Sequence, residues 1–138
     1  MAANGRNERI YRSMRYLNLI KAVKDGVKLP MVISSDADLT RLLEIVSKRM
    51  NMPISEIISN DRHTKNKLAR QIFMVIAIEK YNDYHSSIHI AAHVNRSHST
   101  LLNSIEYITR ISELKDKESV SEYELYLDIR QILCEKDY

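Results

Sequence analysis

Hydrophobic positions along the chain recur mostly at helical spacing, three and four residues apart. The first run predicts an amphipathic helix from about residue 7 to residue 25, followed by a linker. Its apolar stripe consists of Ile10, Met14 and Leu17. The chain therefore divides into a basic N-terminal helix with its linker, residues 1–35, and a helical domain, residues 36–138.

Within the second part, the same spacing predicts six helical segments separated by short turns. They begin near Asp36, Pro53, Leu68, Ser86, Ser97 and Ser121. The helix after Leu68 is hydrophobic over a wide face, so we expect it to be central, and the last helix should use Tyr123, Leu127 and either Ile129 or Arg130 near its seam. Only two glycines and two prolines occur in 138 residues, which favours an all-α domain over a sheet.

Residues 86–110 combine a short helix, a three-residue turn and a longer helix with a polar first turn. Asn95 lies in the turn and tolerates a positive φ, and Ser97 can cap the second helix. This is the plan of a helix-turn-helix, whose second helix enters the DNA major groove. Hydroxyl and imidazole groups in its first turn could donate to bases or phosphates.

Charge is unevenly spread, although the formal net charge is only +3. Residues 1–35 carry seven Lys or Arg against two acids, and residues 62–70 carry four Lys or Arg and no acid. Residues 111–138 are acidic instead. A polyanion would be attracted to the middle of the chain and repelled by its C-terminal end.

The sequence RSHSTLL at residues 96–102 resembles the R-D-H-[ST]-T-V-L motif of a known family, the C-terminal DNA-binding domain of the bacterial replication initiator DnaA. Residues 69–72 resemble the arginine–glutamine helix start of that domain, and residues 90–95 resemble its I-G-x-x-F-G-G segment. The resemblance runs from Leu39 to Leu133. It implies a Trp-repressor-like helical fold.

The resemblance also implies a role for each matching position. It places Arg62 in the minor groove, Arg70 and Gln71 against the DNA backbone, Ser97, His98 and Ser99 at the bases, and Thr100 at a phosphate. The basic stretch and the polar helix face add four candidates, namely Lys65, Lys67, Arg96 and Asn103.

Three positions depart from the family pattern. Ser97 stands where the family has an aspartate that accepts from cytosine, and Ala91 and Val94 stand where it has Gly and Phe. The turn is also one residue shorter. We expect the binding mode to persist while the preferred DNA sequence differs.

The resulting hypothesis is sequence-specific binding of double-stranded DNA, in the control of replication initiation or in transcription regulation. We expect no enzyme activity, cofactor or nucleotide, because neither glycine lies in a phosphate-binding loop motif. No run is long and apolar enough to cross a bilayer, and a single Cys fits a reducing cytoplasm. The resemblance implies that this is the cytoplasm of a bacterial or phage-infected bacterial cell, with the protein associated with the nucleoid. The N-terminal stripe is a possible homodimer interface.

Two alternatives remain. The first is a helical protein-interaction module without DNA, in which the basic N-terminal helix binds an acidic surface. The second is a zinc site built from histidines four residues apart, namely His85, His89 and His93. Against zinc, His85 would precede the helix that Ser86 begins, and residues 84–105 contain no carboxylate. We therefore expect no metal site.

Overall fold

The structure is a computed structural model, and it describes residues 36–136. The predicted N-terminal helix, its linker and the proposed dimer stripe fall within residues 1–35, outside the described residues. They stay predictions.

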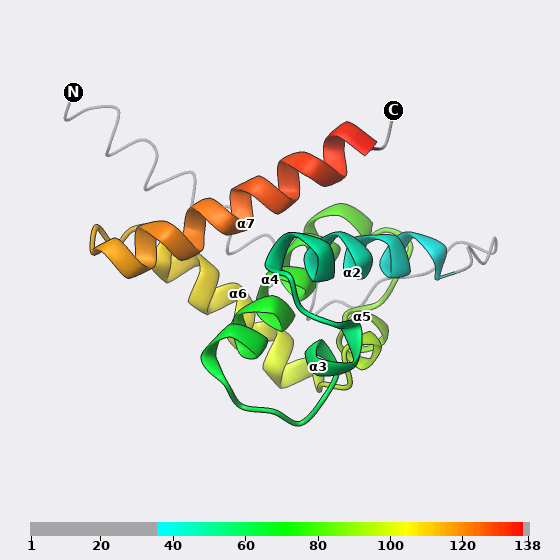
Figure 1. Cartoon of the computed structure of the whole chain (residues 1–138). Helices are drawn as coiled ribbons and strands as arrows, with labels where there is room; N and C mark the ends of the chain where they lie inside the picture. Colours follow the sequence, from blue (N-terminus) through cyan, green and yellow to red (C-terminus); the bar gives the residue numbers. More distant parts are fainter. Residues whose placement is uncertain (1–35, 137–138) are drawn as a thin grey trace.

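Six α-helices and no strand make up the described part of the chain, which confirms the all-α prediction (Figure 1). The helices are α2 (Ala37–Met50), α3 (Ile54–Ile57), α4 (Thr64–Tyr81), α5 (Ser87–His93), α6 (His98–Ile111) and α7 (Lys117–Lys136). In Figure 1, α7 runs along one side of the domain. The loop between α3 and α4 and the turn between α5 and α6 lie on the opposite side.

The α4 helix is the centre of the fold, as its wide hydrophobic face predicts. Every residue from 68 to 78 is buried, and the helix contacts all five other described helices. Each fully buried aliphatic or aromatic side chain stabilises the fold by roughly 1.5–3 kcal/mol. The α4 helix therefore fixes the positions of the other helices, including the two that carry the helix-turn-helix.

The last helix differs from its prediction in start and in buried face. It begins at Lys117 rather than near Ser121, because the Asp116 carboxylate accepts a hydrogen bond from the backbone N–H of Ser119 at 3.0 Å and so caps an earlier turn. The prediction of Leu127 at the seam is wrong, since that side chain is 40% exposed. The buried residues of this helix facing the core are Tyr126, Ile129 and Leu133.

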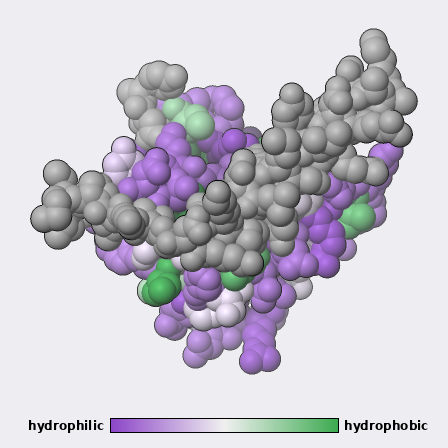
Figure 2. Space-filling view, turned by 180° about the vertical axis from the view of Figure 1, so that it is seen from behind, coloured by the Kyte–Doolittle hydropathy of each residue, from purple (hydrophilic) through white to green (hydrophobic). Residues whose placement is uncertain are grey.

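Most of the described surface on the side shown in Figure 2 is hydrophilic, with hydrophobic side chains in small separate spots. Among the described helices, none has the length and apolarity that a membrane span requires. The buried hydrophobic residues of the described part form one core shared by all six helices.

Candidate nucleic-acid interface

The helix-turn-helix consists of α5, a four-residue connection and α6. The Ser86 hydroxyl accepts from the N–H of His89 at 3.1 Å, and the Ser97 hydroxyl accepts from the N–H of Thr100 at 3.3 Å. Asn95 has a φ of 58°. Both helix caps and the positive φ of Asn95 confirm the local predictions. Serine side chains cap a backbone N–H three residues ahead, and asparagine tolerates a left-handed backbone, so both features follow from nearby residues.

Buried hydrophobic side chains hold α5 against α6 and both against α4. Val94 and Leu101 are completely buried on the two sides of the turn, and Ile90 and Ile105 extend the contact along each helix. The amide of Arg96 donates to the carbonyl of Ala91 at 2.9 Å and closes the turn. The first turn of α6 is therefore held at a fixed angle to the rest of the domain.

The first turn of α6 presents the short polar side chains that were predicted to read bases. Ser97 and Ser99 are exposed, and His98 and Thr100 are half-buried. His98 Nδ1 lies 3.0 Å from the hydroxyl of Ser87, so one ring nitrogen is oriented by α5. The other ring nitrogen, Nε2, can donate or accept according to the tautomer.

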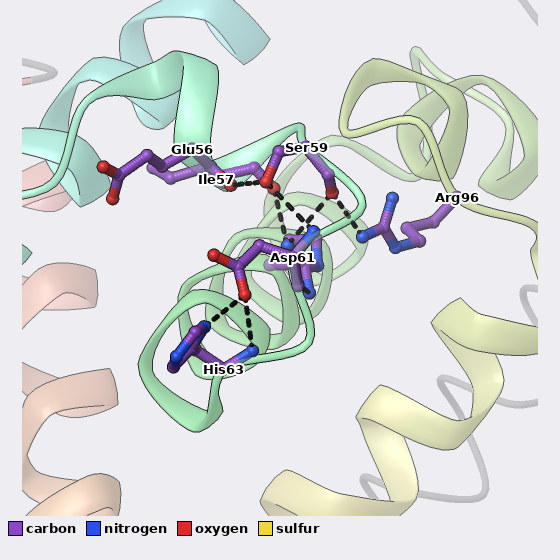
Figure 3. Close-up of polar contacts among 7 residues, drawn as sticks. Glu56, Ile57, Ser59, Asp61, His63 and Arg96 are labelled. Atoms are coloured by element: carbon purple, nitrogen blue, oxygen red, sulfur yellow. Dashed lines mark hydrogen bonds and ion pairs between the residues drawn. The ribbon is translucent and has the colours of Figure 1, made fainter.

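Two arginines attach the loop between α3 and α4 to the rest of the domain. The buried guanidinium of Arg70, on α4, donates to the carbonyls of Ile57 at 3.0 Å, Ser59 at 3.4 Å and Asp61 at 2.7 Å. Arg96, in the helix-turn-helix turn, donates to the same Ser59 carbonyl at 2.6 Å, and Figure 3 shows it extending toward that loop. The loop and the turn are thereby joined through one carbonyl.

Burial lowers the pKa of the Arg70 guanidinium, and the nearby charge of Arg96 lowers it further. A guanidinium stays protonated at neutral pH even so. Two like charges can share this site because the backbone carbonyl dipoles point toward them.

The Asp61 carboxylate contacts the His63 ring within the same loop and forms an ion pair with it when His63 is protonated (Figure 3). The side-chain hydrogen bond between them lowers the pKa of Asp61 and raises that of His63. The Asp61 carboxylate also accepts from the backbone N–H of His63 at 2.9 Å, just before α4 begins. Asp61 therefore shapes the start of α4, and its charge is matched locally.

A groove of about 1120 Å³ separates this loop from α6. Among the described residues, its lining contains no carboxylate and five Lys or Arg side chains, namely Arg62, Lys67, Arg70, Arg96 and Arg110. The α4 helix contributes Lys67, Arg70, Gln71 and Met74 to the lining, and α6 contributes Thr100, Asn103, Ser104, Tyr107 and Arg110. Such a concave cationic surface matches the charge of a nucleic-acid backbone.

The groove brings together eight of the eleven residues predicted from sequence: Arg62, Lys67, Arg70, Gln71, Arg96, Ser97, Thr100 and Asn103. His98 and Ser99 belong to the adjoining first turn of α6. Lys65 instead lines a separate hollow of about 440 Å³ together with Glu122. It lies apart from the other candidates.

Asn60, Tyr107 and Arg110 line the groove but were not among the predicted site residues. Positions 100, 103, 107 and 110 share one face of a helix, and that spacing could have extended the site along α6. The Arg110 guanidinium lies 5.6 Å from the centre of the Tyr107 ring. The Tyr107 hydroxyl donates to Glu122, and burial, aided by this bond, raises the pKa of Tyr107 to about 12.

Comparison with known proteins gives one family match and two related proteins. Residues 39–108 match the family described as the bacterial DnaA protein helix-turn-helix. The chromosomal replication initiator proteins DnaA of Thermotoga petrophila and Thermotoga maritima are each 37% identical to this chain over 90 residues, which is 64% of this chain and 20% of each relative. The chain thus spans about a fifth of the length of these relatives. No solved structure matches it.

Proposed function

Because the chain belongs to the family of bacterial DnaA helix-turn-helix domains, we propose that it binds double-stranded DNA and recognises a particular sequence. The observation that carries this proposal is the groove, which lies between the loop containing Arg62 and α6 and is lined by residues of both. The positive field of its cations would attract the phosphates of a DNA strand, and the exposed ones, Arg62, Lys67 and Arg110, would neutralise phosphates directly. The polar helix start beside it would meet base edges in the major groove.

The sequence-reading group of the proposal is Ser97, His98 and Ser99. They lie at the start of a helix that the core holds rigidly, and two of them are exposed. Serine offers both a donor and an acceptor, whereas aspartate only accepts, so Ser97 allows a different base preference from the family residue. Thr100 and Asn103 follow on the groove side of the same helix and would hold phosphates.

The second group acts from the loop. Arg62 is exposed at the edge of the groove, and we assign it to the adjacent minor groove. Lys67 and Gln71 also line the groove and would hold the DNA backbone, with Lys65 contributing charge from the separate hollow that it lines.

We assign Arg70 and Arg96 mainly to positioning rather than to direct contact. Arg70 is 5% exposed, and its guanidinium donates to three carbonyls of the loop. Arg96 binds the same loop from the helix-turn-helix. Together they would set the spacing between the minor-groove residue Arg62 and the recognition helix.

The relatives are named as chromosomal replication initiators, and on this basis we propose that the chain acts in the control of replication initiation. It could mark an origin or compete for the initiator's sites. Transcription regulation by the same binding is the second form of the proposal. Neither form uses ATP hydrolysis.

Selection of duplexes from a random pool, followed by anisotropy titrations, tests the proposal. We expect a consensus sequence to emerge, with the selected duplex bound at least about 10³-fold more tightly than a scrambled one. The logarithm of the affinity should fall linearly with the logarithm of salt, by about 0.9 per phosphate neutralised. Equal affinities for the two duplexes would refute sequence recognition, and an affinity indifferent to salt would refute DNA binding through the groove.

A further inference from the structure

A cluster of histidines and aspartates lies where the start of α2 meets the start of α5. Asp36 immediately precedes α2, His85 lies in the turn after α4, and His89 lies in the first turn of α5. One ligand atom from each of these three residues lies within 4.8 Å of the other two. None of the three lines the cationic groove.

The contacts within the cluster show that these side chains converge. His89 Nε2 lies 2.8 Å from Asp36 Oδ1, and His85 Nε2 lies 2.9 Å from Asp38 Oδ1. The His85 and His89 rings are stacked with their centroids 5.3 Å apart. The cluster therefore contains two imidazoles and two carboxylates from segments about fifty residues apart in sequence.

The surrounding fold orients the two imidazoles. The backbone N–H of His85 donates to the Tyr81 carbonyl at 2.9 Å, and the hydroxyl of Ser86 caps the turn that carries His89. His85 is buried, whereas the side chains of His89 and Asp36 are a little under half exposed. An ion from solvent can thus reach the cluster on its exposed side while His85 holds a fixed position.

The chemistry and the spacing fit a tetrahedral transition-metal ion. Zinc takes imidazole nitrogen and carboxylate oxygen at about 2.0–2.2 Å, so neighbouring ligand atoms in a tetrahedron lie roughly 3.3 Å apart. The His89–Asp36 contact at 2.8 Å and the His85–Asp38 contact at 2.9 Å are already near that value. The remaining distances among the three ligand atoms, all within 4.8 Å, would shorten by rotation of the partly exposed Asp36 and His89 side chains. Imidazole ligands disfavour Mg²⁺ and Ca²⁺, which prefer oxygen.

One sequence argument against zinc was that residues 84–105, which include His85, His89 and His93, contain no carboxylate. The structure brings Asp36 and Asp38 to them from a distant segment, so that argument fails. His85 does precede α5, as predicted, but it still reaches the cluster from the turn. His93, by contrast, stacks on Phe73 with ring centroids 5.8 Å apart and is not one of the three grouped residues.

We propose that Asp36, His85 and His89 bind one transition-metal dication, Zn²⁺ or its spectroscopic substitute Co²⁺, with Asp38 beside His85 as a fourth or supporting group. The ion would tie the start of α2 to the first helix of the helix-turn-helix. Because the site is separate from the groove, metal binding does not depend on the DNA-binding proposal.

Calorimetry and thermal unfolding of the metal-stripped, tag-free full chain test this site, with ZnCl₂ as the titrant. We expect one equivalent of Zn²⁺ to bind in the micromolar range or below. When free Zn²⁺ is about 100 times the dissociation constant, the melting temperature should rise by about 10 °C. One equivalent of Co²⁺ should give the strong visible absorption of a tetrahedral site.

The variants His89→Gln and Asp36→Asn remove ligands whose side chains are partly exposed, so they should fold, and circular dichroism will verify this. Each should weaken Zn²⁺ binding at least tenfold and lose the thermal shift. His63→Gln is the matched control, because His63 also pairs with an aspartate but has no second histidine in contact. Cys134→Ser tests the exposed thiol. Both controls should bind like the parent chain.

Absence of Zn²⁺ binding by the parent chain at 100 µM total metal would overturn the proposal and leave the cluster as hydrogen-bonded histidine–aspartate pairs only. So would undiminished binding in folded His89→Gln and Asp36→Asn, or loss of binding in Cys134→Ser. A parent chain that binds DNA but no Zn²⁺ refutes the metal site alone, and the reverse result refutes DNA binding alone.

Discussion

The two sides of the domain are connected by different kinds of polar interaction. On the groove side, guanidinium groups donate to backbone carbonyls, and Arg70 and Arg96 converge on Ser59. On the α7 side, the acceptors are side-chain carboxylates. Glu79 accepts from the Tyr126 hydroxyl and pairs with Arg130 at 3.4 Å, and Asp128 pairs with Arg49 at 2.7 Å.

This difference determines where positive charge is left. A carbonyl satisfies the donors of an arginine without cancelling its charge, so the groove keeps a positive field. On the α7 side Arg49 and Arg130 each pair with a carboxylate, and α7 itself carries five acidic against three basic residues. The family match, residues 39–108, includes every residue that lines the groove except Arg110, and it ends before α7. We infer that α7 contributes stability, whereas the groove side contributes binding.

The strongest test of this division is to damage α7 alone. Tyr126 is 1% exposed, and Tyr126→Ala should lower the free energy of unfolding by about 3–5 kcal/mol through the cavity it leaves. Leu127→Ala, on the exposed face of the same helix, should change it by less than about 0.5 kcal/mol. Urea denaturation measures both. DNA affinity measured under conditions where Tyr126→Ala remains folded should equal that of the parent chain, and a specific loss of affinity would break the comparison.

The next test removes the buried arginine that holds the groove loop in place. Arg70→Ala removes the guanidinium donor from the carbonyls of Ile57 and Asp61 and leaves Ser59 with Arg96 alone, so it should lower the free energy of unfolding by about 2–3 kcal/mol. It should also weaken binding to preferred and scrambled DNA alike, because the loop that carries Arg62 is no longer held.

Arg70→Lys keeps the charge but lacks the planar fork that reaches several acceptors, and it should recover only part of both losses. If Arg70 serves only as a phosphate contact, Arg70→Ala will weaken binding while leaving the urea midpoint unchanged. That outcome would reject the positioning role.

Features set by neighbouring residues were predictable from sequence. The caps Ser86 and Ser97 and the positive φ of Asn95 depend on side chains that act within three residues of themselves. The hydrophobic face of α4 was equally plain, because its pattern extends over three turns. Prediction succeeded where local chemistry and burial point to the same structure.

Features set by distant contacts were not predictable in this way. The acceptors of Arg70 are backbone carbonyls, which every residue has, so no residue type in the loop signals them. The Asp36–His89 contact joins residues 53 positions apart. In α7, charged and aromatic residues are mixed around the helix, so the choice of Leu127 over Tyr126 for the core was wrong.

A third prediction separates residues that read the DNA bases from residues that hold the DNA backbone on the groove side. His98→Ala should cost roughly 1–3 kcal/mol on the selected duplex and much less on a scrambled one, because base contacts carry the sequence information. Ser87→Ala, which removes the hydroxyl beside His98 Nδ1, should give a smaller loss of the same kind. Anisotropy titrations against both duplexes measure these changes. Equal losses on the two duplexes would mean that the first turn of α6 does not read bases.

The smallest predicted effect concerns the far end of the groove, where α6 approaches α7. Arg110 lies against the Tyr107 ring, whose hydroxyl is bound to Glu122 of α7, so this is where the two sides of the domain meet. If the positive field of the groove extends this far, Arg110 neutralises one phosphate. Arg110→Gln should then reduce the slope of log affinity against log salt by about 0.9 and weaken binding by roughly 0.5–1 kcal/mol at low salt on both duplexes.

Arg49→Gln is the matched control, because that arginine is paired with Asp128 on the α7 side and should leave the slope unchanged. Equal slopes for Arg110→Gln and the parent chain would place the end of the binding surface before Arg110, whereas a reduced slope for Arg49→Gln would show that the DNA reaches the α7 side as well.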